Sequence, residues 1–159
     1  PEELYRKMKR ARNFQSAIQT MRQLLFAKMD LELHRGKTFA TVEEMTNFLD
    51  SVLEDYRFPL NTPSPDIFPR FTHLFGSPTG YAAGYYSYKY AEMLDADAFG
   101  RFLEEGLLNP ETGREFREKI LARGNSAPPE TLFADFRGRD PDPEALLKRA
   151  DLVPSSPTH

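Results

Sequence analysis

The sequence predicts an all-α protein. Apolar residues recur every three or four positions over most of the chain, which is the spacing of amphipathic helices. No segment shows the sustained alternation of apolar and polar residues that is typical of a half-buried strand. Residues that favour helix ends, among them Gly36, Thr41 and Pro143, stand at the borders of the periodic stretches.

The composition is that of a folded protein. The chain has 159 residues, of which 40% are hydrophobic and 28% are charged, and this length favours one domain with a single core. Its net charge of −3 provides no general cationic field for phosphate backbones, so we expect no nucleic-acid partner. The lack of cysteine excludes disulfides, thiolate zinc sites and a thiol nucleophile, and is compatible with a reducing compartment. We therefore expect a cytoplasmic protein.

The two ends and the longest apolar run bear on the organisation of the chain. The longest run, residues 24–27, is far shorter than the roughly 18 apolar residues of a membrane span, so we expect no membrane partner. The sequence opens at Pro1 without an initiator methionine or a signal peptide, which predicts a piece of a longer protein. We expect residues 1–153 to form one helical part and residues 154–159 to form a flexible tail.

The first half of the chain predicts three helical segments and a loop. The apolar stripe of residues 2–34 is interrupted at Asn13, a residue that favours caps over helix interiors, which predicts a short helix and then a longer one. Thr41 and Glu44 fit a capping box, so a further helix should run from there to about Phe58. Four prolines within residues 59–69 then predict an extended loop packed on the surface.

The second half predicts four more helices. The first covers residues 81–95 and can extend to Glu105, where Gly106 ends it. The others cover residues 111–122, with Phe116, Ile120 and Leu121 pointing inward, residues 128–136 and a short stretch that begins at Pro143.

Tyrosines gather in the first of these helices. Five of the seven lie within residues 81–90. At about 100° per residue, Tyr81, Tyr85 and Tyr88 fall within about 60° on one helix face, whereas Tyr86 and Tyr90 point elsewhere. The stripe is either a core-facing aromatic row or a row of neutral hydrogen-bond donors along a substrate groove, since phenol stays protonated at pH 7.

The three histidines do not form a metal site by spacing. His34, His73 and His159 lie far apart in the sequence, and no pair has the i, i+4 spacing of a helical zinc site. The chain also lacks a P-loop, a dinucleotide-binding glycine cluster and a nucleophile elbow. The sequence therefore gives no support to these three classes of enzyme.

An ordered series of motifs resembles a known family. The series begins with FTHLF at residues 71–75 and GYAAGYYSYKY at residues 80–90, and it continues at residues 91–99, 116–121, 132–139 and 145–147. The similarity extends more weakly upstream, where residues 14–15 and 24–34 resemble the helix that precedes this signature. Together they resemble the C-terminal part of the thimet-oligopeptidase family over nearly the whole chain.

The resemblance implies a zinc metallopeptidase that hydrolyses short peptides in a channel between two largely helical halves. The family's His-Glu-x-x-His helix and its third, glutamate ligand lie upstream of the part represented here. The implied cofactor is therefore zinc in the full-length parent, with its ligands outside this chain. The chain alone should hold no zinc and be inactive, and its partners would be short peptides and the remainder of its own polypeptide.

The resemblance also assigns roles to residues. His73 and Tyr88 would be catalytic and donate hydrogen bonds to the tetrahedral oxyanion or the substrate backbone, while Tyr81 and Tyr85 would bind the peptide near the scissile bond. The turn before Gly80 is longer than in the family's pattern, which affects the placement of His73. The alternative function is a non-catalytic helical interaction module whose tyrosines pack or dock a partner helix.

Overall fold

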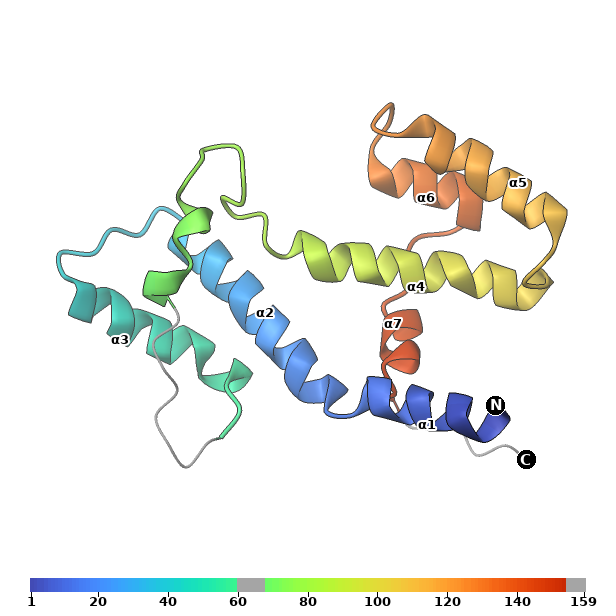
Figure 1. The fold of residues 1–159 in the computed structure, drawn as a ribbon. Helices are drawn as coiled ribbons and strands as arrows, with labels where there is room; N and C mark the ends of the chain where they lie inside the picture. The colour runs from blue at the N-terminus through green and yellow to red at the C-terminus, as the bar shows by residue number, and fades with distance from the viewer. Residues whose placement is uncertain (60–67, 154–159) are drawn as a thin grey trace. The chain divides into compact units, whose positions relative to one another are not determined.

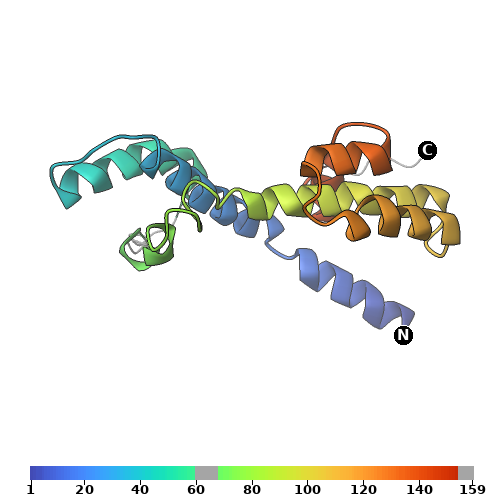
Figure 2. The ribbon, with the colours of Figure 1, turned by 90° about the horizontal axis from the view of Figure 1, so that it is seen from above.

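The structure, a computed structural model, describes residues 1–59 and 68–153 as helices joined by turns. No strand occurs within these ranges, so the predicted all-α class is confirmed. The α-helices described there are shown in Figures 1 and 2: α1 (Glu2–Asn13), α2 (Ser16–Leu33), α3 (Val42–Leu53), α4 (Ser87–Glu105), α5 (Pro110–Lys119), α6 (Pro129–Arg137) and α7 (Glu144–Arg149).

Short 3-10 turns also occur in the described part of the chain. They are η1 (Glu54–Tyr56), η2 (Phe68–Arg70), η3 (Thr72–Leu74) and η4 (Leu121–Arg123). Among them, η1 and η4 follow α3 and α5. The helix expected to reach about Phe58 is therefore α3 followed by η1, and the one expected over residues 111–122 is α5 followed by η4. Most of the expected proline-rich loop and the whole expected tail lie outside the described residues.

Local signals place most helix ends. The break predicted at Asn13 is present, because α1 ends there and Gln15 takes a left-handed conformation before α2 begins. At the start of α3 the Thr41 hydroxyl accepts a hydrogen bond from the Glu44 amide at 3.1 Å. The Glu44 carboxylate accepts from the Ala40 amide at 3.0 Å, one residue before the usual position in a capping box.

The chain divides into two compact units, Pro1–Lys89 and Tyr90–His159. The core of the first unit is built from α2, α3 and η3, and its buried members are Phe26, Met29, Leu49, Leu53 and Leu74. None of the described helices is long and apolar enough to cross a bilayer. The assignment of residues 1–153 to one helical part of a larger protein stays a prediction.

Helix α1 keeps its apolar residues at the surface. Leu4 and Met8 each remain 62% exposed, and no residue of α1 is buried among the described parts of the chain. On the same helix Arg6 pairs with Glu2 and Lys7 pairs with Glu3, as expected for a solvated charged face. The amphipathic pattern of residues 2–13 therefore predicts the helix correctly, but its apolar side chains are not buried among the described residues.

The second unit has its own apolar core, so the expectation of a single core is wrong. Its buried members Ala98, Phe133 and Phe136 come from α4 and α6, and Phe116 of α5 packs edge-on against Phe136 at 5.4 Å between ring centroids. Helices α5 and α6 contact each other and lie side by side in Figure 1. Leu121, expected to point inward, is exposed because the chain leaves the α-helix after Lys119 and forms η4.

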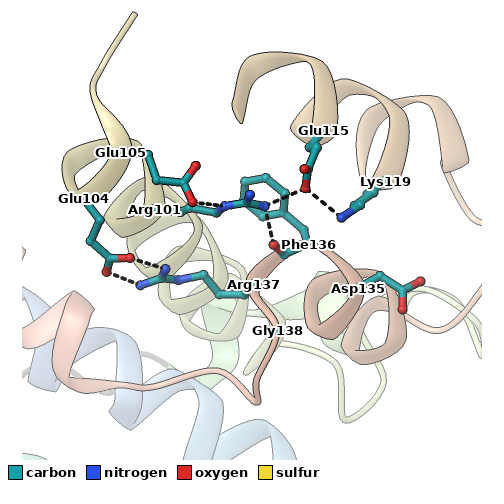
Figure 3. A pocket seen from close by; sticks show the side chains of 9 residues that line it. All are labelled: Arg101, Glu104, Glu105, Glu115, Lys119, Asp135, Phe136, Arg137 and Gly138. Carbon is teal, nitrogen blue, oxygen red and sulfur yellow. Dashed lines mark hydrogen bonds and ion pairs between the residues drawn. The ribbon is translucent and has the colours of Figure 1, made fainter. Parts of the chain in front are cut away.

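A polar groove of about 480 Å³ borders this core, as Figure 3 shows. Arg101 donates hydrogen bonds to Glu105 and Glu115, both at 2.8 Å, and to the Phe136 carbonyl at 2.7 Å. Lys119 donates to Glu115 at 2.7 Å. The charges in the groove are thus largely paired with one another, which indicates a structural network.

This network predicts a pH dependence of stability. Hydrogen bonds from Arg101 and then Lys119 lower the pKa of Glu115 from its ordinary value of 4.5 to about 2. A carboxyl with a lowered pKa in the folded state stabilises that state above its unfolded pKa, and the contribution is lost as the pH falls through the folded pKa. We expect the melting temperature to fall between about pH 5 and pH 2 and, in circular dichroism melts, to fall less steeply for Glu115→Gln. An equally steep fall for the variant would contradict the assignment.

Candidate active site

The expected tyrosine cluster lies in a series of turns that leads into α4. Residues 78–86 form consecutive turns, and the α-helix begins only at Ser87, so the prediction of a helix from Tyr81 is wrong (Figure 1). We call residues 80–86 the tyrosine turn. Its backbone is closed by short-range hydrogen bonds, such as Gly84 N–H to the Tyr81 carbonyl at 2.8 Å.

A buried carboxylate explains why this segment is not helical. Asp30 of α2 accepts hydrogen bonds from the amides of Ala83 at 3.1 Å and Tyr85 at 2.8 Å. In an α-helix these amides would bond to carbonyls four residues earlier. Ala83 instead adopts a left-handed conformation with φ of 55°, which lies outside the range of an α-helix.

The turn nevertheless brings the three predicted tyrosines together. The rings of Tyr81 and Tyr88 are stacked with centroids 6.1 Å apart, and their hydroxyls form a hydrogen bond. The Tyr85 ring lies 5.9 Å from that of Tyr81 and 5.2 Å from that of Tyr88. The juxtaposition that helix geometry predicted is therefore present, although a different backbone path produces it.

His73 joins this cluster from η3. Its ring meets the Tyr81 ring edge-on with centroids 4.9 Å apart, and it lies 6.3 Å from the Tyr85 ring. The neighbouring Leu74 is fully buried in the core of the first unit and anchors the segment, while His73 itself is exposed. The longer turn before Gly80 thus still leaves the imidazole beside the tyrosines.

The tyrosines differ in their surroundings. Tyr85 packs edge-on against the buried Phe26 ring, and burial raises the pKa of its phenol. Tyr88 is 46% exposed. The hydrogen bond with Tyr81 raises the pKa of its phenol. Both shifts favour the neutral phenol, so these groups remain hydrogen-bond donors at physiological pH.

The remaining tyrosines of the segment point elsewhere, as predicted. Tyr86 and Tyr90 are exposed, and neither has a ring contact with the cluster. Gly84 of the same segment lies close to the backbone of the turn itself. The atoms nearest to a Cβ at Gly84 are carbonyl atoms of Gly80 and Tyr81, at 3.5 Å and beyond.

The described residues do not form a metal site. Within residues 1–59 and 68–153 no group of three or more histidine, aspartate or glutamate side chains could hold a metal ion. The imidazole of His73 lies among aromatic rings instead of carboxylates. The tyrosine cluster therefore offers neutral donors and aromatic surface to a ligand, without metal ligands of its own.

Comparison with known proteins decides the family. The sequence profile of Peptidase family M3 matches residues 1–152. The chain belongs to peptidase family M3. The motifs that resemble the thimet-oligopeptidase family lie inside this match, so the resemblance to these peptidases is confirmed.

Similar M3 relatives include oligopeptidases of bacteria and plants. The chain is 44% identical to oligopeptidase A of Escherichia coli over 151 residues, which cover 93% of the chain and 22% of the relative. It is 41% identical to the probable cytosolic oligopeptidase A of Arabidopsis thaliana, over 98% of the chain and 22% of the relative. It is 34% identical to dipeptidyl carboxypeptidase of Salmonella typhimurium, over 96% of the chain and 22% of the relative. The chain thus spans about a fifth of the length of these relatives.

Sequence analysis of this M3 chain missed one residue of the site. Asp30 holds two amides of the tyrosine turn, yet no motif singled it out. The sequence did contain one signal, which is the place of Asp30 on the apolar stripe of α2. Asp30 comes one helical turn after Phe26 and one position after Met29. A carboxylate at such a position indicates a buried partner.

Proposed function

We propose that this chain is the C-terminal helical part of a zinc-dependent oligopeptidase that hydrolyses short peptides. Two observations support the proposal: membership in peptidase family M3, and the hydrogen-bonded hydroxyls of Tyr81 and Tyr88 beside the His73 ring. The second observation carries the assignment of roles. It supports these roles because neutral donors that lie together on an accessible face are suited to stabilise a developing oxyanion.

In this proposal Tyr88 is the main donor to the oxyanion. If the Tyr81 hydroxyl donates to Tyr88 oxygen, the proton of Tyr88 is free to point at a substrate. Accepting one hydrogen bond also makes a hydroxyl a better donor of the next. An ordinary phenol stays neutral at pH 7, so Tyr88 keeps its proton in this arrangement.

The other predicted residues have supporting roles. His73 would donate a second hydrogen bond to the oxyanion or the substrate backbone, and Tyr81 would hold the peptide near the scissile bond. Tyr85 would contact the peptide with its exposed part, while its buried part supports the Tyr81 and Tyr88 rings from the core side.

We propose that the metal and the rest of the channel come from the remainder of the polypeptide. The described residues offer no metal site, and the M3 relatives are about five times as long as the matched part. The exposed apolar face of α1 would then be covered by that remainder. A cytoplasmic location is supported by the absence of cysteine and by the name of the cytosolic plant relative.

The test is peptide cleavage by the full parent protein with and without a chelator. We expect the parent to hydrolyse short peptides, to lose activity in the chelator and to regain it when zinc is added. The 159-residue chain alone should be inactive. A parent that holds zinc but cleaves no peptide in any length series would contradict the proposal and favour the interaction module.

A further inference from the structure

The deepest polar group of the first unit is a carboxylate without a cationic lysine or arginine beside it. Asp30 lies on α2 next to the buried Phe26 and Met29, and is itself 0% exposed. A buried carboxylate is costly unless several donors satisfy it. The groups that donate to Asp30 therefore indicate its structural role.

Two of the donors are backbone amides of the tyrosine turn. The Oδ1 atom accepts from Ala83 N–H at 3.1 Å, and Oδ2 accepts from Tyr85 N–H at 2.8 Å. The two amides flank Gly84, so the carboxylate spans the middle of the turn. Tyr81 precedes the two bonded amides in the sequence and Tyr88 follows them. The contact with Asp30 therefore fixes the backbone that connects the two tyrosines.

The third donor is the imidazole of His34. Its Nδ1 lies 2.9 Å from the Oδ1 atom of Asp30 and 2.9 Å from the Asp30 carbonyl oxygen. Both neighbours are acceptors, so Nδ1 carries the proton. The same ring stacks on Phe75 with centroids 5.0 Å apart, and Phe75 follows His73 by two residues. Asp30 on α2 and His34 just after its end thus contact both segments that carry the candidate site.

We propose that Asp30 is a positioning residue of the active site, which fixes the Tyr81 and Tyr88 hydroxyls by holding the tyrosine turn through two amides, with His34 orienting its carboxylate. The inference rests on the proposed function for its effect on catalysis. The chemistry requires a carboxylate, because two acceptor oxygens face donors on both sides. An asparagine at this position would present one NH₂ group to a donor.

The first measurement reports on the turn without any reference to activity. Asp30→Asn, made in the full-length parent, should speed amide hydrogen exchange at Ala83 and Tyr85 by at least about tenfold, because one of the two bonds becomes a contact between donors. Asp97→Asn is the matched control, since Asp97 is 1% exposed and also accepts a backbone amide, that of Asp142. It should destabilise the second unit and leave exchange at Ala83 and Tyr85 unchanged.

The second measurement separates positioning from stability. At a temperature where all variants are folded, Asp30→Asn should lower kcat by about 10-fold to 100-fold with a smaller change in KM, as expected for a donor displaced by about 1 Å. If Asp30 acts through Tyr88, the variant Asp30→Asn in a Tyr88→Phe background should be no slower than Tyr88→Phe alone. If Asp30→Asn instead causes a general structural defect that is independent of Tyr88, the fold-losses of kcat in the two single variants should multiply in the double variant.

Each outcome decides the proposal. Unchanged exchange at Ala83 and Tyr85, multiplied losses in the double variant, or an equal loss of kcat in Asp97→Asn would overturn it. If Tyr88→Phe itself leaves kcat unchanged, the proposed role of Tyr88 as oxyanion donor fails, while exchange still tests whether Asp30 holds the turn. If Asp30→Asn does not fold, His34→Leu takes its place: it removes the Nδ1 donor but keeps an apolar contact for Phe75. It should speed exchange at Ala83, and no change there would overturn the proposal.

Discussion

Under the proposed function, Tyr88→Phe in the full-length parent should lower kcat by about 10²–10³ with little change in KM, because an oxyanion donor acts mainly in the transition state. The substitution removes the hydroxyl that bonds to Tyr81 but keeps the ring, which stacks on Tyr81 at 6.1 Å. Packing is thus preserved and hydrogen bonding is lost. Steady-state kinetics with a short peptide substrate, measured at pH 7, would give both constants.

Tyr86→Phe is the control for this experiment. Tyr86 belongs to the same turn and is exposed, but its ring has no contact with the cluster, so its hydroxyl should be dispensable. If the tyrosines serve only as packing, both variants should keep the parent's kcat, since neither loses its ring. A Tyr88→Phe enzyme with unchanged kcat, or two equally slow variants, would show that Tyr88 is not the donor.

The helices that local signals specify could be predicted from the sequence. Thr41 caps α3, Asn13 ends α1 and Gly106, with φ of 109°, ends α4, each at the predicted place. These positions depend on hydrogen bonds and dihedral angles within a few residues, which are visible in the sequence. The error at residues 81–86 has another cause: the amides there bond to Asp30, more than fifty residues earlier.

The site could be predicted better than the backbone that forms it. Helix geometry placed Tyr81, Tyr85 and Tyr88 on one side because they are spaced by four and three residues, and the turn keeps this grouping. The position of His73 could not follow from spacing, since Leu74 anchors it in a core made by α2 and α3. Asp30 was missed for the same reason, because its role depends on a contact between distant segments.

Removing the other fully buried carboxylate should have the largest effect on stability. Asp97→Ala is expected to lower the free energy of unfolding by about 3 kcal/mol, the low end for breaking a buried ion pair. Asp97 accepts from Arg139 at 2.6 and 2.7 Å, from the Asp142 amide at 2.7 Å and from Arg137 at 3.1 Å. Burial alone would raise its pKa, but hydrogen bonds from Arg139, Asp142 and Arg137 together lower it.

The loss of unfolding free energy in Asp97→Ala should stay at about 3 kcal/mol, because Arg137 keeps a second carboxylate partner. Arg137 still forms two hydrogen bonds with Glu104, at 2.6 and 2.7 Å, whereas Arg139 is open enough to regain water. Asp95→Ala on the same helix is the matched control, since Asp95 pairs with Arg149 but its side chain is 69% exposed. An exposed pair contributes about 0–1 kcal/mol. Urea unfolding followed by circular dichroism compares the two variants, and equal small losses would mean that the Asp97 network does not stabilise the fold.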